Sequence, residues 1–253
     1  MKVGLFIPCY VDQFYPQVGV ATLRLLESVG CEVEFPMQQT CCGQPLANSG
    51  MEQEAIPIYQ HFVETFQAYE YVVAPSSSCV YHVNHHYDVM PQNETVKDVR
   101  NKTLDVCAFL VDVLQIKDLT ASFPYKVGLH QSCHGLRGLR MAKSSELRTP
   151  SYSKWEQLLS MVSDIELITL DRPDECCGFG GTFSIFEAAV STKMGTDKIN
   201  DHQRNGAQYI TSGDMSCLMH MDGLLKRTKS KTKVIHMVEI LAGHLVSKEE
   251  MLT

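Results

Sequence analysis

Two pairs of adjacent cysteines, each followed by glycine, are the residues of this sequence best suited to chemistry. They stand at Cys41-Cys42-Gly43 and Cys176-Cys177-Gly178. Adjacent cysteines are poor partners for each other, because a trans dipeptide does not supply the Cα separation and Cβ directions of an ordinary disulfide. A turn that presents two thiolates can instead bind a metal ion or an iron–sulfur cluster. The following glycines allow backbone N–H groups to approach an anionic group closely.

Eight of the ten cysteines follow one scheme that occurs twice: a lone cysteine, an adjacent pair and a later cysteine. The first set is Cys9, Cys41, Cys42 and Cys79, and the second set is Cys133, Cys176, Cys177 and Cys217. Cysteines that serve only packing have no reason to repeat such an order. The other two, Cys31 and Cys107, are expected to pack as small hydrophobic residues. Each half of the chain therefore offers four thiolate ligands.

The spacing of these ligands bears on the kind of metal site. Structural zinc sites usually take their ligands from two close pairs, each separated by a few residues. Here the ligands of each half come from three distant places in the sequence. This favours a bulky iron–sulfur cluster held across a crevice, and zinc in one half or both remains the alternative.

The elements that must position these cysteines alternate between strands and helices. Apolar runs and helical periodicity predict strands at 2–7, 31–35, 71–74, 125–130, 166–170, 207–211 and 233–235. They predict helices at about 16–29, 57–68, 83–87, 103–116, 183–203 and 236–246. Such alternation predicts an α/β fold with mainly parallel sheets and right-handed crossovers. Most of the cysteines follow predicted strands, so we expect cysteine loops at the carboxyl ends of strands, where ligand sites in such sheets lie.

The repeated order of strands and cysteines predicts an internal duplication. The junction is expected near 105–122, with a first domain at 1–115 and a second at 116–253.

Composition limits the function. No segment approaches the roughly 18–20 continuous apolar residues of a membrane span, and the start reads as a strand rather than a signal peptide, so we expect a cytoplasmic protein. The net charge of −7 argues against nucleic acid as a partner. Ten cysteines in such a chain indicate metal binding or catalysis rather than a disulfide framework. Nucleotide-binding glycine motifs are absent from the sequence, so a flavin or nicotinamide bound by this chain is not expected.

Three polar residues surround the lone cysteine of the second half. His130 and His134 flank Cys133, and Arg137 follows about one helical turn later. We predict catalytic roles for two of them. His134 is expected to donate a hydrogen bond to a cluster or relay a proton. Arg137 is expected to bind a substrate carboxylate, and a surface arginine with a local partner is the alternative.

Histidines also stand beside the last cysteine of each set. His82, His85 and His86 follow Cys79, and Asp214 and His220 bracket Cys217. Offsets of three and four place the first group on one helix face. A solvent-exposed histidine cluster is the simpler interpretation, and a mixed cysteine and histidine zinc site is the alternative.

Four motifs carry a resemblance that covers nearly the whole chain. They are Phe6-Ile7-Pro8-Cys9, Cys41-Cys42-Gly43-Gln44-Pro45, Ser132-Cys133-His134-Gly135-Leu136-Arg137 and Cys176-Cys177-Gly178-Phe179-Gly180-Gly181-Thr182-Phe183. Together they resemble the cysteine-rich CCG domain of heterodisulfide reductase and of the iron–sulfur subunits of glycolate and glycerol-3-phosphate oxidases. The most similar pattern is that of the lactate-utilisation protein A family, which has two such domains.

This resemblance implies an iron–sulfur electron-transfer subunit of an oxidoreductase that converts L-lactate to pyruvate. It implies clusters of the 4Fe-4S type held by the eight cysteines, and two other lactate-utilisation subunits as partners, one of them an iron–sulfur protein. Another 2-hydroxy acid such as glycolate is an alternative substrate. The chain departs from the Cys-x-x-Cys element of heterodisulfide reductase, because Ser76 and Asp214 stand where the first cysteine of that element would be.

The sequence is compatible with two other classes of function. In one, zinc stabilises the fold and the chain only docks its partners. In the other, the adjacent cysteines act directly in thiol–disulfide exchange, which requires an exposed thiolate of low pKa.

Overall fold

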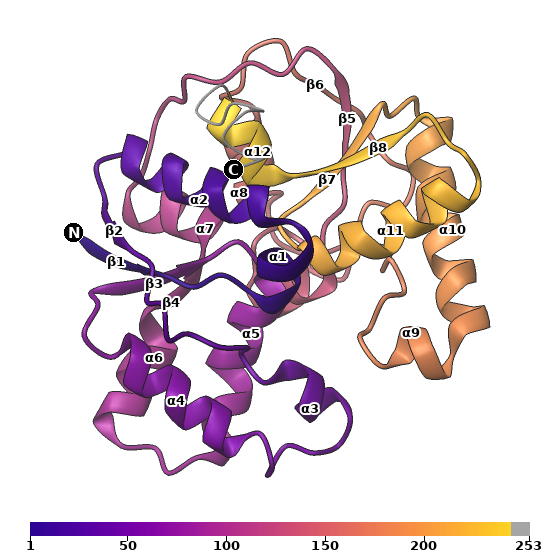
Figure 1. Ribbon diagram of the computed structural model, residues 1–253. Coiled ribbons are helices and arrows are strands. Elements are labelled where there is room, and N and C mark those ends of the chain that lie inside the picture. Colours follow the sequence, from indigo (N-terminus) through magenta and orange to yellow (C-terminus); the bar gives the residue numbers. More distant parts are fainter. Residues whose placement is uncertain (244–253) are drawn as a thin grey trace.

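A computed structural model of the protein describes residues 1–243 (Figure 1). The first half consists of β1 (Lys2–Leu5), α1 (Cys9–Phe14), α2 (Pro16–Ser28), β2 (Glu32–Glu34), α3 (Gln44–Asn48), α4 (Ile56–Phe66), β3 (Tyr71–Ala74), α5 (Ser77–His86), η1 (Tyr87–Val89), α6 (Glu94–Lys102), β4 (Thr103–Asp105), α7 (Val106–Ala108) and η2 (Phe109–Val113). The second half consists of β5 (Lys126–Leu129), η3 (His134–Gly138), α8 (Lys154–Leu159), β6 (Glu166–Leu167), α9 (Phe183–Phe186), α10 (Ala188–Arg204), β7 (Tyr209–Ser212), α11 (Met215–Arg227), β8 (Lys233–His236) and α12 (Met237–Ala242).

The strands form two sheets of four, and every pairing within them is parallel. The order is β2-β1-β3-β4 in the first sheet and β6-β5-β7-β8 in the second. Each half thus repeats the same topology, with its first strand paired to its second and third. The predicted α/β fold with duplicated halves and parallel sheets is confirmed.

Two predicted helices differ from the structure. The one at 103–116 begins instead with β4, since Thr103–Asp105 pairs with β3, and the chain becomes helical only from Val106. The side chain of Asp105 caps that helical start by accepting a hydrogen bond from the Cys107 N–H. The helix predicted at 183–203 is broken at Glu187, whose backbone (φ −116°, ψ 44°) separates α9 from α10.

Several helices were absent from the prediction, among them α6, α8 and α11. The part of the last predicted helix that extends past 243 lies outside the described residues.

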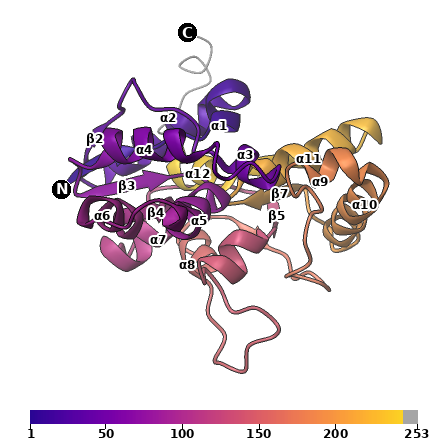
Figure 2. The same cartoon turned by 90° about the horizontal axis from the view of Figure 1, so that it is seen from below.

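The two halves share one hydrophobic core. Its buried residues include Val3 and Leu5 of β1 and Met237, Val238 and Leu241 of α12. The last described helix therefore packs against α2 of the first half, and Figure 2 shows it lying between the N-terminal elements and α9–α11. A second cluster lies within the first half and includes Phe6, Phe62 and Phe66. The exact division at 115/116 stays a prediction.

No helix within residues 1–243 is long and apolar enough to cross a membrane.

Candidate metal centre

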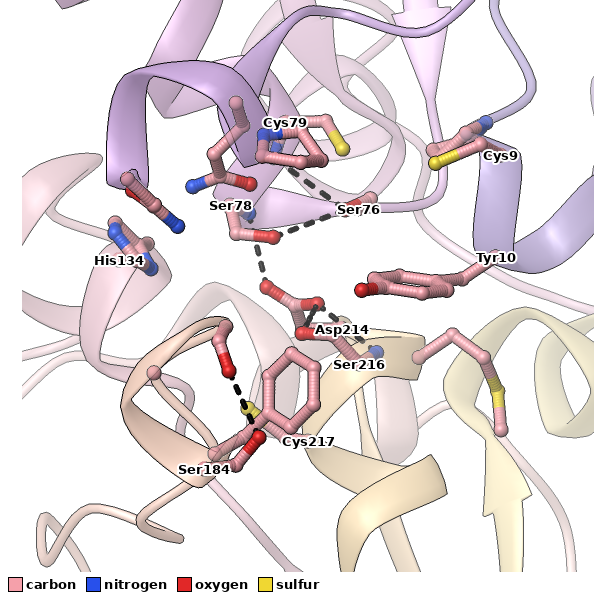
Figure 3. Close-up of a pocket in the computed structure, with 18 of the residues that line it drawn as sticks. Cys9, Tyr10, Ser76, Ser78, Cys79, His134, Ser184, Asp214, Ser216 and Cys217 are labelled. Carbon is pink, nitrogen blue, oxygen red and sulfur yellow. Dashed lines mark hydrogen bonds between the residues drawn. The ribbon is translucent and has the colours of Figure 1, made fainter. Parts of the chain in front are cut away.

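All eight cysteines of the repeated scheme line one cavity of about 520 Å³ between the two halves. Figure 3 shows three of them, Cys9, Cys79 and Cys217. The lone cysteines follow β1 and β5, the adjacent pairs lie in the loops after β2 and β6, and the last cysteines lie in the first turns of α5 and α11. Because parallel strands present their carboxyl ends at the same edge of a sheet, segments distant in sequence meet here. The structure thus brings together every cysteine that the sequence singled out, and their role as ligands stays a prediction.

The cysteines of the first half form a compact group of sulfur atoms. The Cys9 and Cys41 Sγ atoms are 3.7 Å apart, and the Gly43 N–H donates a hydrogen bond of 3.4 Å to the Cys41 Sγ. Hydrogen bonds from Cys42 and Cys9 lower the pKa of Cys41, whereas the bond to Cys41 raises the pKa of Cys9. One thiolate is therefore stabilised by hydrogen bonds from protonated neighbouring thiols. A soft metal ion that binds these sulfur atoms displaces the remaining protons.

The second half repeats this chemistry. The Gly178 N–H donates a hydrogen bond of 3.3 Å to the Cys176 Sγ. Hydrogen bonds from Cys133 and Cys177 lower the pKa of Cys176, and the bond to Cys176 raises the pKa of Cys133. Each glycine after a pair has a positive φ, 87° at Gly43 and 84° at Gly178, which glycine adopts without the strain of a side chain.

The residues that replace cysteine in the Cys-x-x-Cys element have a structural role. Ser76 caps α5 by accepting a hydrogen bond from the Cys79 N–H, and Asp214 caps α11 by accepting one from the Ser216 N–H. Ser76 and Asp214 also form an antiparallel β-bridge to each other, which joins the two halves beside the cavity. Sequence reasoning treated Ser76 as a missing ligand, and Asp214 as a missing ligand or a member of a mixed metal site with His220. Their preference for helix N-caps was the signal that it missed.

His134 and Arg137 are placed differently. His134 lines the cavity, with its Nδ1 3.9 Å from the Cys133 Sγ. Arg137 is not among the lining residues, because its guanidinium pairs with Glu146 at 2.6 Å and with Asp174 at 3.5 Å. Arg137 therefore has the local acidic partners of the alternative interpretation, in which it is a surface arginine that does not bind a substrate carboxylate.

The histidines near the last cysteines are engaged with other partners. The His82 Nε2 lies 3.0 Å from the Tyr59 hydroxyl, and the His86 Nδ1 lies 3.0 Å from Glu52. The His220 Nε2 lies 3.3 Å from the Ser191 carbonyl oxygen. The prediction of a solvent-exposed histidine cluster at 82–86 is only partly confirmed, because His82 is buried.

His130 is the histidine that joins a metal-binding arrangement. One of its ring nitrogens and the Sγ atoms of Cys177 and Cys217 all lie within 4.8 Å of one another. Within residues 1–243 this is the one group of three or more cysteine, histidine or carboxylate side chains so placed. Sequence reasoning noted His130 beside Cys133 and did not foresee that it would meet the other cysteines of its half.

Comparison with known proteins agrees with this architecture. The cysteine-rich domain family named CCG matches residues 3–84 and 127–222, one stretch in each half. A solved structure of a hypothetical protein from Helicobacter pylori has the same fold, with a TM-score of 0.59 at 12% identity over 99% of this chain and 50% of that one.

Two curated relatives are much closer in sequence. "Lactate utilization protein A" of Halalkalibacterium halodurans is 40% identical, over 99% of this chain and 100% of its own length. "Lactate utilization protein A" of Oceanobacillus iheyensis is 39% identical, over 96% of this chain and 98% of its own length. With both halves matched and relatives similar from end to end, this chain belongs to the CCG cysteine-rich family that includes the lactate utilization proteins A.

Proposed function

We propose that this chain is the iron–sulfur electron-transfer subunit of a complex that oxidises L-lactate to pyruvate. The observation that carries the proposal is the convergence of both cysteine sets on one cavity. The relatives named for lactate utilisation supply the substrate class. Cys9, Cys41, Cys42 and Cys79 would hold one cluster of the 4Fe-4S type, and Cys133, Cys176, Cys177 and Cys217 the other. A bound cluster would supply one-electron chemistry, and this chain supplies thiolates and shielding from water.

The lining of the cavity favours electron transfer over substrate binding. Within the described part of the chain, neither lysine nor arginine lines it. The carboxylate of a 2-hydroxy acid is usually bound by such cations, most often by a bidentate guanidinium. We infer that the hydroxy acid binds on another subunit. Its oxidation to the keto acid releases two electrons and two protons, and the electrons reach this chain for transfer to an acceptor outside it.

The complex would contain two other lactate-utilisation subunits, one of them an iron–sulfur protein. The free thiols of all ten cysteines suit a reducing compartment, and we propose the cytoplasm.

A zinc-stabilised docking module is the second candidate function. The observation that favours it is the group formed by His130, Cys177 and Cys217, because histidine and cysteine together are typical ligands of structural zinc. In that case the chain would organise the complex without carrying electrons.

Metal analysis separates the two functions. The protein is purified without oxygen, reconstituted with iron and sulfide, and assayed for iron, acid-labile sulfide and zinc. Electron transfer predicts iron and sulfide in similar amounts, lost in part in Cys41→Ser and in Cys176→Ser. Cys31→Ser is the matched control, because Cys31 is buried away from the cavity and should retain full loading. Stoichiometric zinc without sulfide would overturn the electron-transfer role.

The substrate is tested on the assembled complex. L-lactate should reduce the clusters of this subunit, as seen by bleaching of their visible absorbance, faster than D-lactate or glycolate. Faster bleaching by glycolate would assign the complex to another 2-hydroxy acid.

A further inference from the structure

His130 is a buried imidazole without a hydrogen-bond partner. Its side chain is 1% exposed, directly after β5, and neither ring nitrogen has a partner among residues 1–243. An unsatisfied polar group in the interior costs free energy, and native structures usually satisfy such groups. A neutral imidazole has a nitrogen lone pair that can bind a metal ion.

The imidazole faces two cysteines of the second set. A ring nitrogen of His130 and the Sγ atoms of Cys177 and Cys217 lie within 4.8 Å of one another. In a tetrahedral site with ligands at roughly 2.0–2.3 Å, neighbouring ligand atoms lie about 3.5 Å apart. Small side-chain movements would therefore allow one metal ion to contact all three atoms.

The first half has no such imidazole, because Phe6 occupies the equivalent position. Both residues directly follow the first strand of their sheet, three positions before the lone cysteine. The Phe6 N–H donates to the Val73 carbonyl at 3.0 Å, and the His130 N–H donates to the Thr211 carbonyl at 2.7 Å, so their backbones have the same place in the two sheets. The Phe6 ring packs edge-on against Phe62, with the ring centroids 4.9 Å apart.

A second buried histidine packs on the strand that precedes His130. His202 of α10 packs directly on β5, and a Cβ at Gly128 would lie 2.1 Å from its Nδ1. Residues 128 and 130 are two positions apart along the chain, so they face the same side of an extended strand.

We propose that the His130 imidazole is a direct ligand of the metal centre of the second half, together with Cys177 and Cys217. Cys133 and Cys176 supply further thiolates there, so the second centre has a mixed nitrogen and sulfur ligand set while the first is all thiolate. This inference rests on the proposed function in taking the second cysteine set to bind metal.

X-ray absorption at the metal edge tests the inference, because it distinguishes imidazole nitrogen from thiolate sulfur. The protein is loaded without oxygen, and the wild type is compared with His130→Phe, which copies the first half, and with His130→Cys. The control is His61→Phe, since His61 lies outside the cavity lining and its Nε2 is 2.7 Å from the Gln38 carbonyl oxygen. Nitrogen scattering is expected in the wild type and in His61→Phe. His130→Phe should lose it and bind metal at the second centre at least about 10-fold more weakly. His130→Cys should bind metal with sulfur scattering only.

The outcomes separate this inference from the proposed function. Iron and sulfide without nitrogen scattering would overturn the histidine ligand and leave electron transfer standing. Zinc with nitrogen scattering that disappears in His130→Phe would support the ligand and overturn electron transfer. If nitrogen scattering persists in His130→Phe, the nitrogen ligand belongs to another histidine and the proposal is overturned. Thermal melting of the metal-free variants checks the fold: His130→Phe removes an unsatisfied polar group and should melt no lower than the wild type, so its loss of metal reflects the ligand.

Discussion

The backbone N–H of Ser78 donates a hydrogen bond of 2.9 Å to the buried carboxylate of Asp214, across the boundary between the two halves. The same carboxylate accepts hydrogen bonds from the N–H and hydroxyl of Ser216, at 3.3 and 2.7 Å. Two helix starts, each carrying a cysteine of the cavity, are thus tied to one side chain (Figure 3). Asp214 stands where the Cys-x-x-Cys element of heterodisulfide reductase would have its first cysteine. In this chain its side chain joins the two halves.

Replacing Asp214 should therefore weaken the fold as well as the cavity. Asp214→Ala removes the α11 cap and leaves the buried Ser78 N–H unsatisfied, and we expect a loss of about 2–4 kcal/mol in the free energy of unfolding. Denaturant unfolding of the metal-free protein measures it. Asp214→Asn keeps one acceptor oxygen and should lose clearly less. Equal losses in the two variants would show that the hydrogen bonds are not the cause.

The glycine after the second cysteine pair cannot accept a side chain. In Gly178→Ala the added Cβ would lie 2.6 Å from the Met194 Cβ and 2.8 Å from the Ser191 carbonyl oxygen. Gly206 is the matched control, because its φ of 87° is similar and no atom lies within 4 Å of its Cβ position. Both alanines suffer the strain of a left-handed backbone, roughly 1 kcal/mol. Gly178→Ala should lose a further 1–3 kcal/mol or so from the clash.

Metal loading provides a second readout for this pair of glycines. Moving the backbone at position 178 disturbs the N–H that donates to the Cys176 Sγ. Iron content should fall in Gly178→Ala and stay at the wild-type value in Gly206→Ala. A normal iron content in both variants would mean that the turn tolerates the displacement.

His236 should make stability depend on pH. It is buried and its Nδ1 accepts a hydrogen bond from the Val238 N–H at the start of α12, and burial lowers its pKa to about 4. A neutral imidazole of this kind contributes stability that is complete above the unfolded-state pKa of about 6.5 and is lost as pH falls toward 4. Between pH 7 and pH 5 the loss is about 2 kcal/mol.

The variant that isolates this effect is His236→Asn, whose side-chain oxygen can still cap the helix. Other buried histidines, such as His82 and His202, contribute losses of the same sign in both proteins. Unfolding free energies at pH 7 and pH 5 should therefore fall by about 2 kcal/mol less in the variant than in the wild type. Identical pH dependence would exclude His236 as a contributor.

Arg137 should be dispensable for metal binding. It is exposed, and its ion pairs with Glu146 and Asp174 lie outside the cavity lining. Exposed ion pairs contribute about 0–1 kcal/mol, so Arg137→Ala should change stability little and leave iron content unchanged. The KM for lactate of the assembled complex should also stay the same. A large rise in that KM would restore the carboxylate-binding role predicted from the sequence.

The sequence by itself determined the α/β architecture, the duplication and the two sets of four cysteines. These features depend on residue type and on local order along the chain: apolar runs make strands, helical periodicity makes helices, and a repeated order of cysteines is visible without any contact. Strand β4 could not be predicted from the sequence, because Thr103–Asp105 becomes a strand only by pairing with β3.

The tertiary structure decided what surrounds the cysteines. His130 meets Cys177 and Cys217 because β5, β6 and β7 are neighbours in one sheet, and Asp214 meets Ser78 because the two halves pack against each other. Arg137 lies outside the cavity lining because its guanidinium pairs with Glu146 and with Asp174, which is 37 positions away in the sequence. Each of these relationships joins residues from separate parts of the chain, so pairing, packing and burial set them, and no local pattern in the sequence does.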